Sequence, residues 1–141
     1  VFLDGQLGAA LLDQHGLALS LDEGSNAGDT AAAIIDLVGD IAVNDALFQQ
    51  VLDKAGWDKS EVDNYVLHQA NARIIQSIAK RLGEPEEKFP MNLHRYGNMS
   101  SASIPVLLDE LNQAGKLKRG ERIILSGFGA GLTYGATALI W

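Results

Sequence analysis

The sequence predicts an α/β fold in which helices pack on the faces of a mixed sheet. Short apolar runs at 65–67 and 122–126 have the length of buried strands. Three longer segments, 45–55, 71–82 and 101–114, place their apolar residues at helical spacing. Because strands and helices are interspersed along the chain, we expect a sheet that is covered by helices.

The composition is typical of a single globular domain. The 141 residues are enough for a sizeable core, and 47% of them are apolar against 21% charged. The formal net charge of −7 disfavours nucleic acid as a partner, because phosphate binding needs a basic face. No apolar run approaches the ~18 residues of a membrane-spanning helix, and no signal peptide opens the chain. We therefore expect a cytoplasmic protein without a membrane partner.

The chain contains no cysteine. This excludes disulfides, thiolate metal sites and a cysteine nucleophile within these residues. His15 and His94 do not have metal-ligand spacing with His68, so we expect no metal site. The chain starts at Val1 inside a strand-like run, which suggests a processed or cut chain.

The first part of the chain predicts a strand hairpin followed by a surface connection. Asp4-Gly5 is a hairpin turn signal between the strand-like runs 1–3 and 8–12. Turn-forming residues dominate the connection that follows, up to Gly28. Apolar residues at helical spacing then predict a helix over 30–43.

Capping residues set the expected ends of the next helices. Asn44 is a good N-cap for the helix that follows it, and Gly56 ends that helix. Ser60 and Asp63 are spaced as a capping box for a single helical turn. Gly83 terminates the helix predicted over 71–82.

The segment after this helix predicts a short strand, a loop and another helix. Phe89 to Leu93 reads as a strand that Pro90 confines to an edge of the sheet. Residues 95–99 form a loop, and Ser100 or Ser101 caps the helix that follows. Pro105 then falls in the first helical turn, where a missing N–H costs least.

Two polar side chains are the candidates for chemistry. His68 directly follows the strand 65–67, at the carboxyl end where open α/β sheets place their ligands. Asn98 lies 30 residues further on, beside Gly97. An imidazole suits acid–base work and a neutral amide can stabilise a developing oxyanion. The structural alternatives remain open, because a single histidine is often structural and an Asn beside a Gly often only makes a turn.

A glycine-rich bend at 127–131 connects the strands predicted for 122–126 and 132–141. It is either a tight β-hairpin or an oxyanion hole whose backbone N–H groups face a thioester carbonyl. It is not a nucleotide-binding loop, because that fingerprint requires a helix after the glycines.

Three tracts together resemble the ketoacyl synthase III family, condensing enzymes of thiolase fold. The tract His68-Gln69-Ala70-Asn71 with Arg73-Ile74-Ile75 is similar to the histidine motif of that family. Residues 95–105, RYGNMSSASIP, resemble its asparagine motif, and residues 127–135, GFGAGLTYG, resemble its terminal glycine loop. The match covers about 45–141. It implies a thiolase-like C-terminal half over 29–141, with 1–28 closing the N-terminal half.

The resemblance implies an acyltransferase with a Cys-His-Asn triad. In this family the cysteine takes an acyl group from acyl-coenzyme A, and malonyl-acyl carrier protein then loses carbon dioxide to give the attacking carbanion. His68 and Asn98 would each donate a hydrogen bond to the thioester oxygen, and the backbone N–H near Ala130 would complete an oxyanion hole.

The same resemblance implies roles for residues of the helix after His68. Ala70, Asn71 and Ile74 fall where the family lines its pantetheine tunnel. Arg73 and Lys80 match basic positions that dock the acyl carrier protein, although a solvated helix face is the alternative for both. Coenzyme A or phosphopantetheine thioesters would be substrates, with no covalently bound cofactor, and the full enzyme would be a homodimer.

The cysteine-bearing half of such an enzyme is missing, so we expect this chain to be inactive alone. Two other readings stay open: a non-catalytic synthase-like partner subunit, and acyl transfer to another acceptor. The chain length of the acyl group is not predicted, because Met99 and the segment from Thr30 to Asn44 depart from the family pattern.

Overall fold

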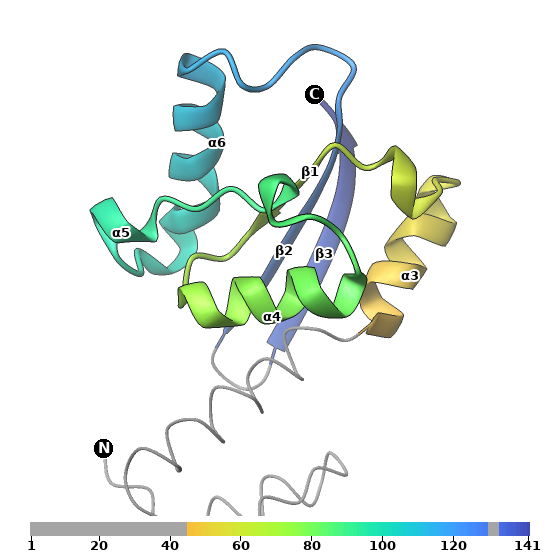
Figure 1. Cartoon of the computed structure of the whole chain (residues 1–141), viewed down its shortest axis with the longest axis horizontal. Helices are drawn as coiled ribbons and strands as arrows, with labels where there is room; N and C mark the ends of the chain where they lie inside the picture. Colours follow the sequence, from red (N-terminus) through yellow and green to blue (C-terminus); the bar gives the residue numbers. More distant parts are fainter. Residues whose placement is uncertain (1–44, 130–132) are drawn as a thin grey trace, which may run out of the picture. The chain divides into compact units, whose positions relative to one another are not determined.

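The computed structural model describes residues 45–129 and 133–141 (Figure 1). The predicted hairpin at 1–12, the helix at 30–43, the Asn44 cap and the backbone of Ala130 lie outside the described residues.

The described residues contain one mixed sheet of three strands in the order β1-β2-β3. β1 (Asn64–Leu67) runs parallel to β2 (Arg122–Gly129), and β2 runs antiparallel to β3 (Thr133–Ile140). Among the described strands, none pairs with the outer edge of β3. The prediction of a mixed sheet is confirmed.

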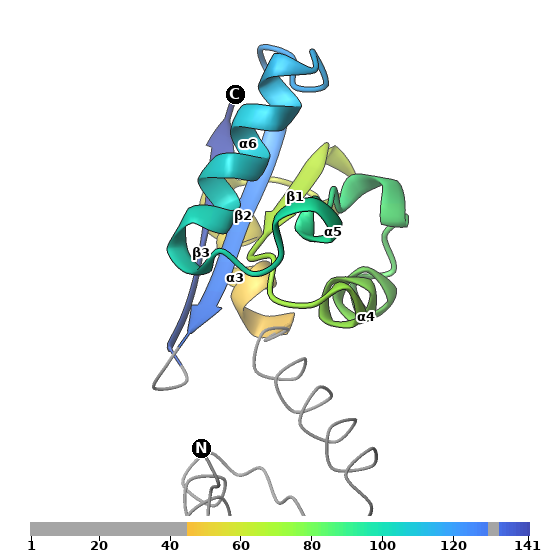
Figure 2. The ribbon, with the colours of Figure 1, turned by 90° about the vertical axis from the view of Figure 1, so that its left-hand side faces the viewer.

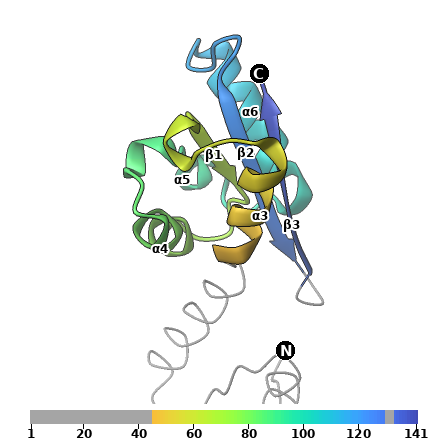
Figure 3. The same cartoon turned by 90° about the vertical axis from the view of Figure 1, so that its right-hand side faces the viewer.

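The described residues also form four α-helices: α3 (Asp45–Ala55), α4 (Ala72–Leu82), α5 (Leu93–Tyr96) and α6 (Ser103–Gln113). Three short 3₁₀ turns join them: η1 (Lys59–Glu61), η2 (Glu86–Lys88) and η3 (Ser100–Ala102). Figures 2 and 3 show α6 on one face of the sheet and α3 on the other.

β1 is buried on both faces, as its continuous apolar run predicts. Val66 points to the α6 side and is fully buried there with Ile123 of β2 and with Leu107, Leu111 and Leu117. Successive strand residues face opposite ways, so Tyr65 lies on the other side. Its ring stacks on Phe89 at 4.7 Å between centroids and meets Phe48 of α3 edge-on at 6.1 Å.

Several helices end at the capping and terminating residues that the sequence predicts. Asn71 caps α4 by accepting a hydrogen bond from the Arg73 N–H at 2.9 Å, and Gly83 closes it in a left-handed conformation with φ of 66°. Gly56 follows α3, also with positive φ. Pro105 lies in the first turn of α6, as predicted.

The residues predicted for the capping box are wrong. The capping box uses Asp58 and Glu61 rather than Ser60 and Asp63: Asp58 accepts from the Ser60 N–H at 2.9 Å, and Glu61 accepts from the Asp58 N–H at 2.8 Å. The Asp63 carboxylate instead accepts from the Arg122 N–H at 2.8 Å and so links η1 to β2.

Phe89 to Leu93 does not form a strand. Phe89 ends η2, and α5 begins at Leu93. Pro90 offers no N–H for strand pairing, and the Asn92 N–H is taken by the buried side chain of Gln69 at 3.1 Å. A side chain therefore replaces the neighbouring strand as the hydrogen-bond partner.

The first three residues of the bend predicted for 127–131 belong to a strand. Gly127, Phe128 and Gly129 continue β2, where Gly127 pairs with Gly135 and Gly129 with Thr133. Two glycines facing each other across a ladder are unusual in a strand. In this sheet they leave open space beside the strand where a pocket forms.

Candidate active site

His68 directly follows β1, and its backbone is fixed by the sheet. Its N–H donates to the Ser126 carbonyl at 2.8 Å, which continues the parallel pairing of β1 with β2. The imidazole is half-buried and lies edge-on to the Phe128 ring at 5.2 Å. Burial lowers the pKa of His68 below its ordinary value, which favours the neutral ring near neutral pH.

A serine that the sequence did not single out contacts the imidazole. The Oγ of Ser103, the first residue of α6, lies 2.7 Å from His68 Nδ1. Ser103 is fully buried. The helix cap predicted at Ser100 or Ser101 is wrong, because those residues form η3 and the helix begins at Ser103.

Asn98 lies in a turn with unusual backbone geometry. Gly97 has φ of 66° and ψ of −159°, a region that is essentially restricted to glycine. Ser100 is the one non-glycine residue of the described part with positive φ, at 53°. Its N–H donates to Asn98 Oδ1 at 2.9 Å. Since the oxygen of the amide is engaged, its NH₂ group remains as the donor.

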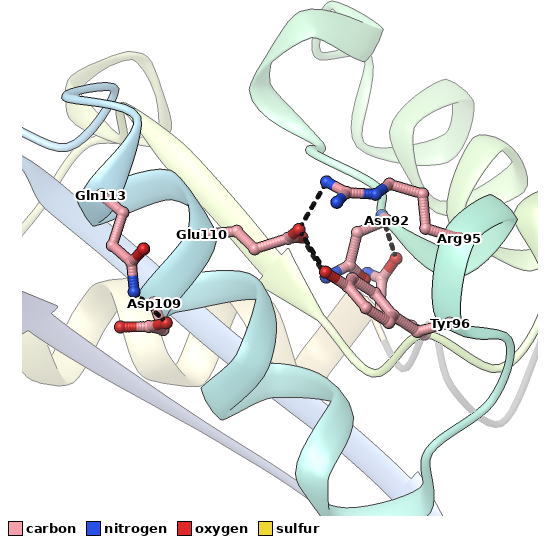
Figure 4. Close-up of polar contacts among 7 residues, drawn as sticks. Asn92, Arg95, Tyr96, Asp109, Glu110 and Gln113 are labelled. Atoms are coloured by element: carbon pink, nitrogen blue, oxygen red, sulfur yellow. Dashed lines mark hydrogen bonds and ion pairs between the residues drawn. The ribbon is translucent and has the colours of Figure 1, made fainter.

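A carboxylate on α6 holds the segment that precedes Asn98 (Figure 4). Glu110 accepts hydrogen bonds from Asn92 Nδ2 at 2.7 Å, from Arg95 Nη1 at 2.7 Å and from Tyr96 Oη at 2.8 Å. The hydrogen bond from Asn92, together with the one from Tyr96, lowers the pKa of Glu110. The contacts tie α5 to α6 just before the Gly97–Asn98 turn.

His68 and Asn98 line one pocket, which has a volume of about 500 Å³. We call it the His68–Asn98 pocket. It is bounded by the end of β1, the turn before α6, and the paired ends of β2 and β3. Its lining residues are His68, Asn98, Ser100, Ser101, Ser103, Ile104, Gly127, Phe128, Gly129, Thr133, Tyr134 and Gly135.

The glycines of β2 give this pocket its space. A Cβ added at Gly127 would lie 3.7 Å from Ile104 Cδ1 and 3.9 Å from His68 Cβ. Those are ordinary van der Waals distances, so an alanine would fit and would fill part of the wall beside the imidazole. The absence of side chains at 127 and 129 therefore leaves room for a ligand next to His68.

The other predicted site residues lie apart from this pocket in the described part of the chain. Ile74 is buried in the core, and the side chain of Asn71 is occupied as the cap of α4. Ala70 is half-buried in the turn between them and His68. Arg73 and Lys80 are both exposed on α4, two helical turns apart.

Comparison with known proteins identifies the family. The chain belongs to the 3-oxoacyl-[acyl-carrier-protein] synthase III family, whose C-terminal model matches residues 52–141. A beta-ketoacyl-[acyl-carrier-protein] synthase III of Clostridium botulinum strain Hall is 48% identical over 100 residues, which are 71% of this chain and 30% of that protein. The Clostridium novyi protein of the same name is 52% identical over 92 residues, 65% of this chain and 28% of that protein.

Solved structures show the same relationship. The crystal structure of beta-ketoacyl-[acyl carrier protein] synthase III from Thermus thermophilus superposes with a TM-score of 0.70 at 35% identity. The superposition covers 88% of this chain and 39% of the Thermus thermophilus chain. The thiolase-like α/β fold predicted from the sequence is thereby confirmed. The chain spans about 30% of the length of the curated relatives it matches.

Among the described helices, none has the length and apolar character needed to cross a membrane.

Proposed function

We propose that this chain is the C-terminal half of an acyltransferase that condenses acyl-coenzyme A with malonyl-acyl carrier protein in fatty acid or polyketide synthesis. The observation that carries the proposal is that His68 and Asn98, 30 residues apart in sequence, line one pocket. A cysteine-bearing N-terminal half, on the same chain or a separate one, would supply the nucleophile. The names of the relatives support this assignment.

In this proposal the acyl group is held on the cysteine of the other half, and malonyl thioester enters the pocket beside it. Loss of carbon dioxide leaves an enolate whose oxygen needs hydrogen-bond donors. The NH₂ group of Asn98 is suited to this task, because Oδ1 accepts from the Ser100 N–H and the NH₂ group donates to none of the described residues. The backbone N–H near Ala130 would serve the oxyanion of the acyl-enzyme.

The proposal also assigns binding roles to residues in α4 and in the turn before it. Ala70, Asn71 and Ile74 would line the pantetheine tunnel once the other half covers this region, and Arg73 with Lys80 would dock the acidic acyl carrier protein. Both basic side chains are exposed on one helix, which supports the docking role. We further propose a cytoplasmic homodimer of the full enzyme that needs no covalently bound cofactor.

The test is decarboxylative condensation by the protein assembled with its cysteine-bearing half. Asn98→Ala and His68→Ala should each lower the rate by about 10²–10³, the usual cost of losing one oxyanion donor or its equivalent. Asp109→Asn, on the exposed side of α6, is the matched control and should keep the rate. The chain alone should show no turnover, because it has no cysteine to hold the acyl group.

The outcomes separate the alternatives. If both variants keep nearly full rate, the chain is a non-catalytic partner subunit and the proposed function is wrong. If acyl loading proceeds normally but malonyl thioester is not consumed, malonyl thioester is not the acceptor, and acyl transfer to another acceptor becomes the favoured alternative.

A further inference from the structure

Asn92 connects the segment beside His68 with the segment that carries Asn98. It is 3% exposed and lies directly before α5. Its backbone N–H donates to the buried side chain of Gln69 at 3.1 Å, and Gln69 follows His68 in the chain. Its side-chain Nδ2 donates to Glu110 of α6 at 2.7 Å (Figure 4). One buried residue therefore links the end of β1 to α6 at the point where the chain turns towards Asn98.

The side chain of Asn92 does not form the helix cap that its position favours. An asparagine before a helix usually has an extended backbone and accepts a hydrogen bond from an N–H of the first turn. Asn92 has φ of −129° and ψ of 5°, and its side chain makes no cap hydrogen bond. Its Oδ1 is buried without a partner in the described part of the chain. Because an unpaired buried carbonyl is unfavourable, the amide is held towards Glu110 although a cap would satisfy its oxygen.

The orientation of the Asn92 amide is fixed by the Glu110 carboxylate. If the amide were turned by half a rotation, its oxygen would face the carboxylate, and two acceptors would oppose each other. The same carboxylate accepts from Arg95 and Tyr96, the last two residues of α5. Glu110 therefore holds the residue before α5 as well as the end of that helix.

The helix α5 transmits the position of Asn92 to Asn98, because it is a single turn of four residues. The Asn92 carbonyl accepts from the Arg95 N–H at 2.9 Å, which starts the turn. The Gly97 N–H donates to the Leu93 carbonyl at 2.8 Å, which closes it, and Asn98 follows. A segment this short and this fully hydrogen-bonded moves as a unit, so a displacement of Asn92 displaces Asn98.

We propose that Asn92 is a positioning residue that sets the place of the Asn98 amide relative to the His68 imidazole. Asn92 itself is not among the residues that line the His68–Asn98 pocket. It acts through Gln69 on one side and through Glu110 on the other. The consequence for the reaction rests on the proposed function, in which Asn98 donates to the enolate oxygen. A catalytic group misplaced by about 1 Å lowers a rate by up to about 10²-fold.

The placement of Asn98 is tested by ¹⁵N–¹H spectra of its side-chain amide in the full 141-residue chain, identified by their loss in Asn98→Asp. Asn92→Ser is the informative variant, because serine is a good helix cap but its shorter side chain does not reach Glu110. It should keep α5 and shift the Asn98 signals.

The matched control for this measurement is Asn112→Ala, because Asn112 is exposed on α6. It should leave the Asn98 signals in place. Unchanged Asn98 signals in Asn92→Ser would overturn the inference, whatever the activity of the assembled protein. If Asn92→Ser does not fold, Glu110→Gln weakens the same contact from the exposed side, and unchanged Asn98 signals in that variant would overturn the inference equally.

The effect on the reaction is tested in the protein assembled with its cysteine-bearing half. Asn92→Ser should lower kcat for condensation by about 10-fold to 10²-fold, while KM for malonyl thioester stays within about twofold, because the residue contacts no ligand. Acyl loading should keep its rate, since Asn98 is proposed to serve only the decarboxylation step. Adding Glu110→Gln should lower kcat no further than the more damaging single variant, because both changes act through one contact.

The outcomes separate this inference from the proposed function. Full kcat in Asn92→Ser, together with a strongly reduced kcat in Asn98→Ala, would overturn the positioning role alone. Full kcat in Asn98→Ala would count against the proposed function, and the Asn98 spectra of the chain would still decide whether Asn92 sets the place of that amide. A lower kcat with reduced acyl loading would contradict the inference, because it would show a general loss of structure.

Discussion

The two sides of the His68–Asn98 pocket are positioned by different means. His68 continues a buried strand pairing, and its ring rests on a fully buried hydroxyl. Asn98 lies in an exposed turn with positive φ on both sides of it, and α5 before it is held by the Glu110 contacts. The His68 imidazole is thus held by the core, whereas the Asn98 amide is held by backbone geometry and by polar contacts at the surface. Changes in the core should disturb both sides, and changes in the surface contacts should disturb only one.

Gln69 joins the two sides, and replacing it should have the largest effect. Its buried side chain donates to the Leu67 carbonyl at 2.9 Å and accepts from the Asn92 N–H at 3.1 Å. Gln69→Leu leaves both groups buried without partners, which should cost about 3 kcal/mol of unfolding free energy. Urea unfolding measures this. Gln76→Leu on the exposed face of α4 is the control and should stay within about 0.5 kcal/mol of wild type. If Gln69→Leu and Gln76→Leu lost the same unfolding free energy, the buried contacts of Gln69 would not link the two sides of the pocket.

Gly97→Ala should cause the next largest loss of unfolding free energy. It should affect only the Asn98 side of the pocket. Its φ of 66° and ψ of −159° disfavour any side chain, so alanine should cost about 1–3 kcal/mol in the same unfolding measurement. Gly115→Ala is the comparison, because Gly115 also has φ of 66° but follows α6 away from the pocket. Gly97→Ala should change the ¹⁵N–¹H signals of the Asn98 side chain, and Gly115→Ala should not. Unchanged Asn98 signals in Gly97→Ala would show that the turn does not depend on glycine.

Glu110→Gln should loosen α5 with a smaller effect on global stability. The neutral amide loses the charge-assisted bonds to Arg95 and Tyr96. We expect faster hydrogen exchange of the Arg95, Tyr96 and Gly97 amides, which donate to the Asn92 and Leu93 carbonyls. Asp109→Asn is the matched control, since Asp109 contacts Gln113 within its own helix (Figure 4). Equal exchange in the two variants would show that Glu110 does not hold α5.

The smallest expected effect is the pH dependence that His68 contributes. Because its pKa is lowered in the folded protein, the unfolded chain binds the proton first as the pH falls. Wild-type stability should therefore decrease relative to His68→Gln between about pH 7 and about pH 5, across the ordinary histidine pKa. Unfolding free energies of the two proteins over this range test the sign. A wild type that gains stability over His68→Gln on acidification would contradict the lowered pKa.

The parts of the fold that local sequence determines were predictable. The strand β1 follows from an apolar run, and α4 follows from its Asn71 cap and Gly83 stop. Phe89–Leu93 was mispredicted because a distant side chain, Gln69, takes the N–H that a strand would pair. Gly127 and Gly129 read as a bend because their role depends on β3, which lies opposite them.

The candidate site was predictable only in its outline. His68 and Asn98 stood out by residue type and by motif, and the structure brings both to one pocket. Their catalytic roles remain predictions. Ser103 could not be found from the sequence, because it lies 35 residues from His68 and contacts the imidazole only after α6 has packed against β1. The Glu110 contacts likewise depend on the packing of α6 against α5.

The unpaired outer edge of β3 has a consequence for handling the isolated chain. This strand, TYGATALI, carries no charged residue and no proline, and Ile140 is 64% exposed. Natural edge strands usually carry such residues to prevent pairing with other chains. Where no described strand pairs with this edge, two copies of the chain would be able to join strand to strand, and their like net charge of −7 would oppose that association.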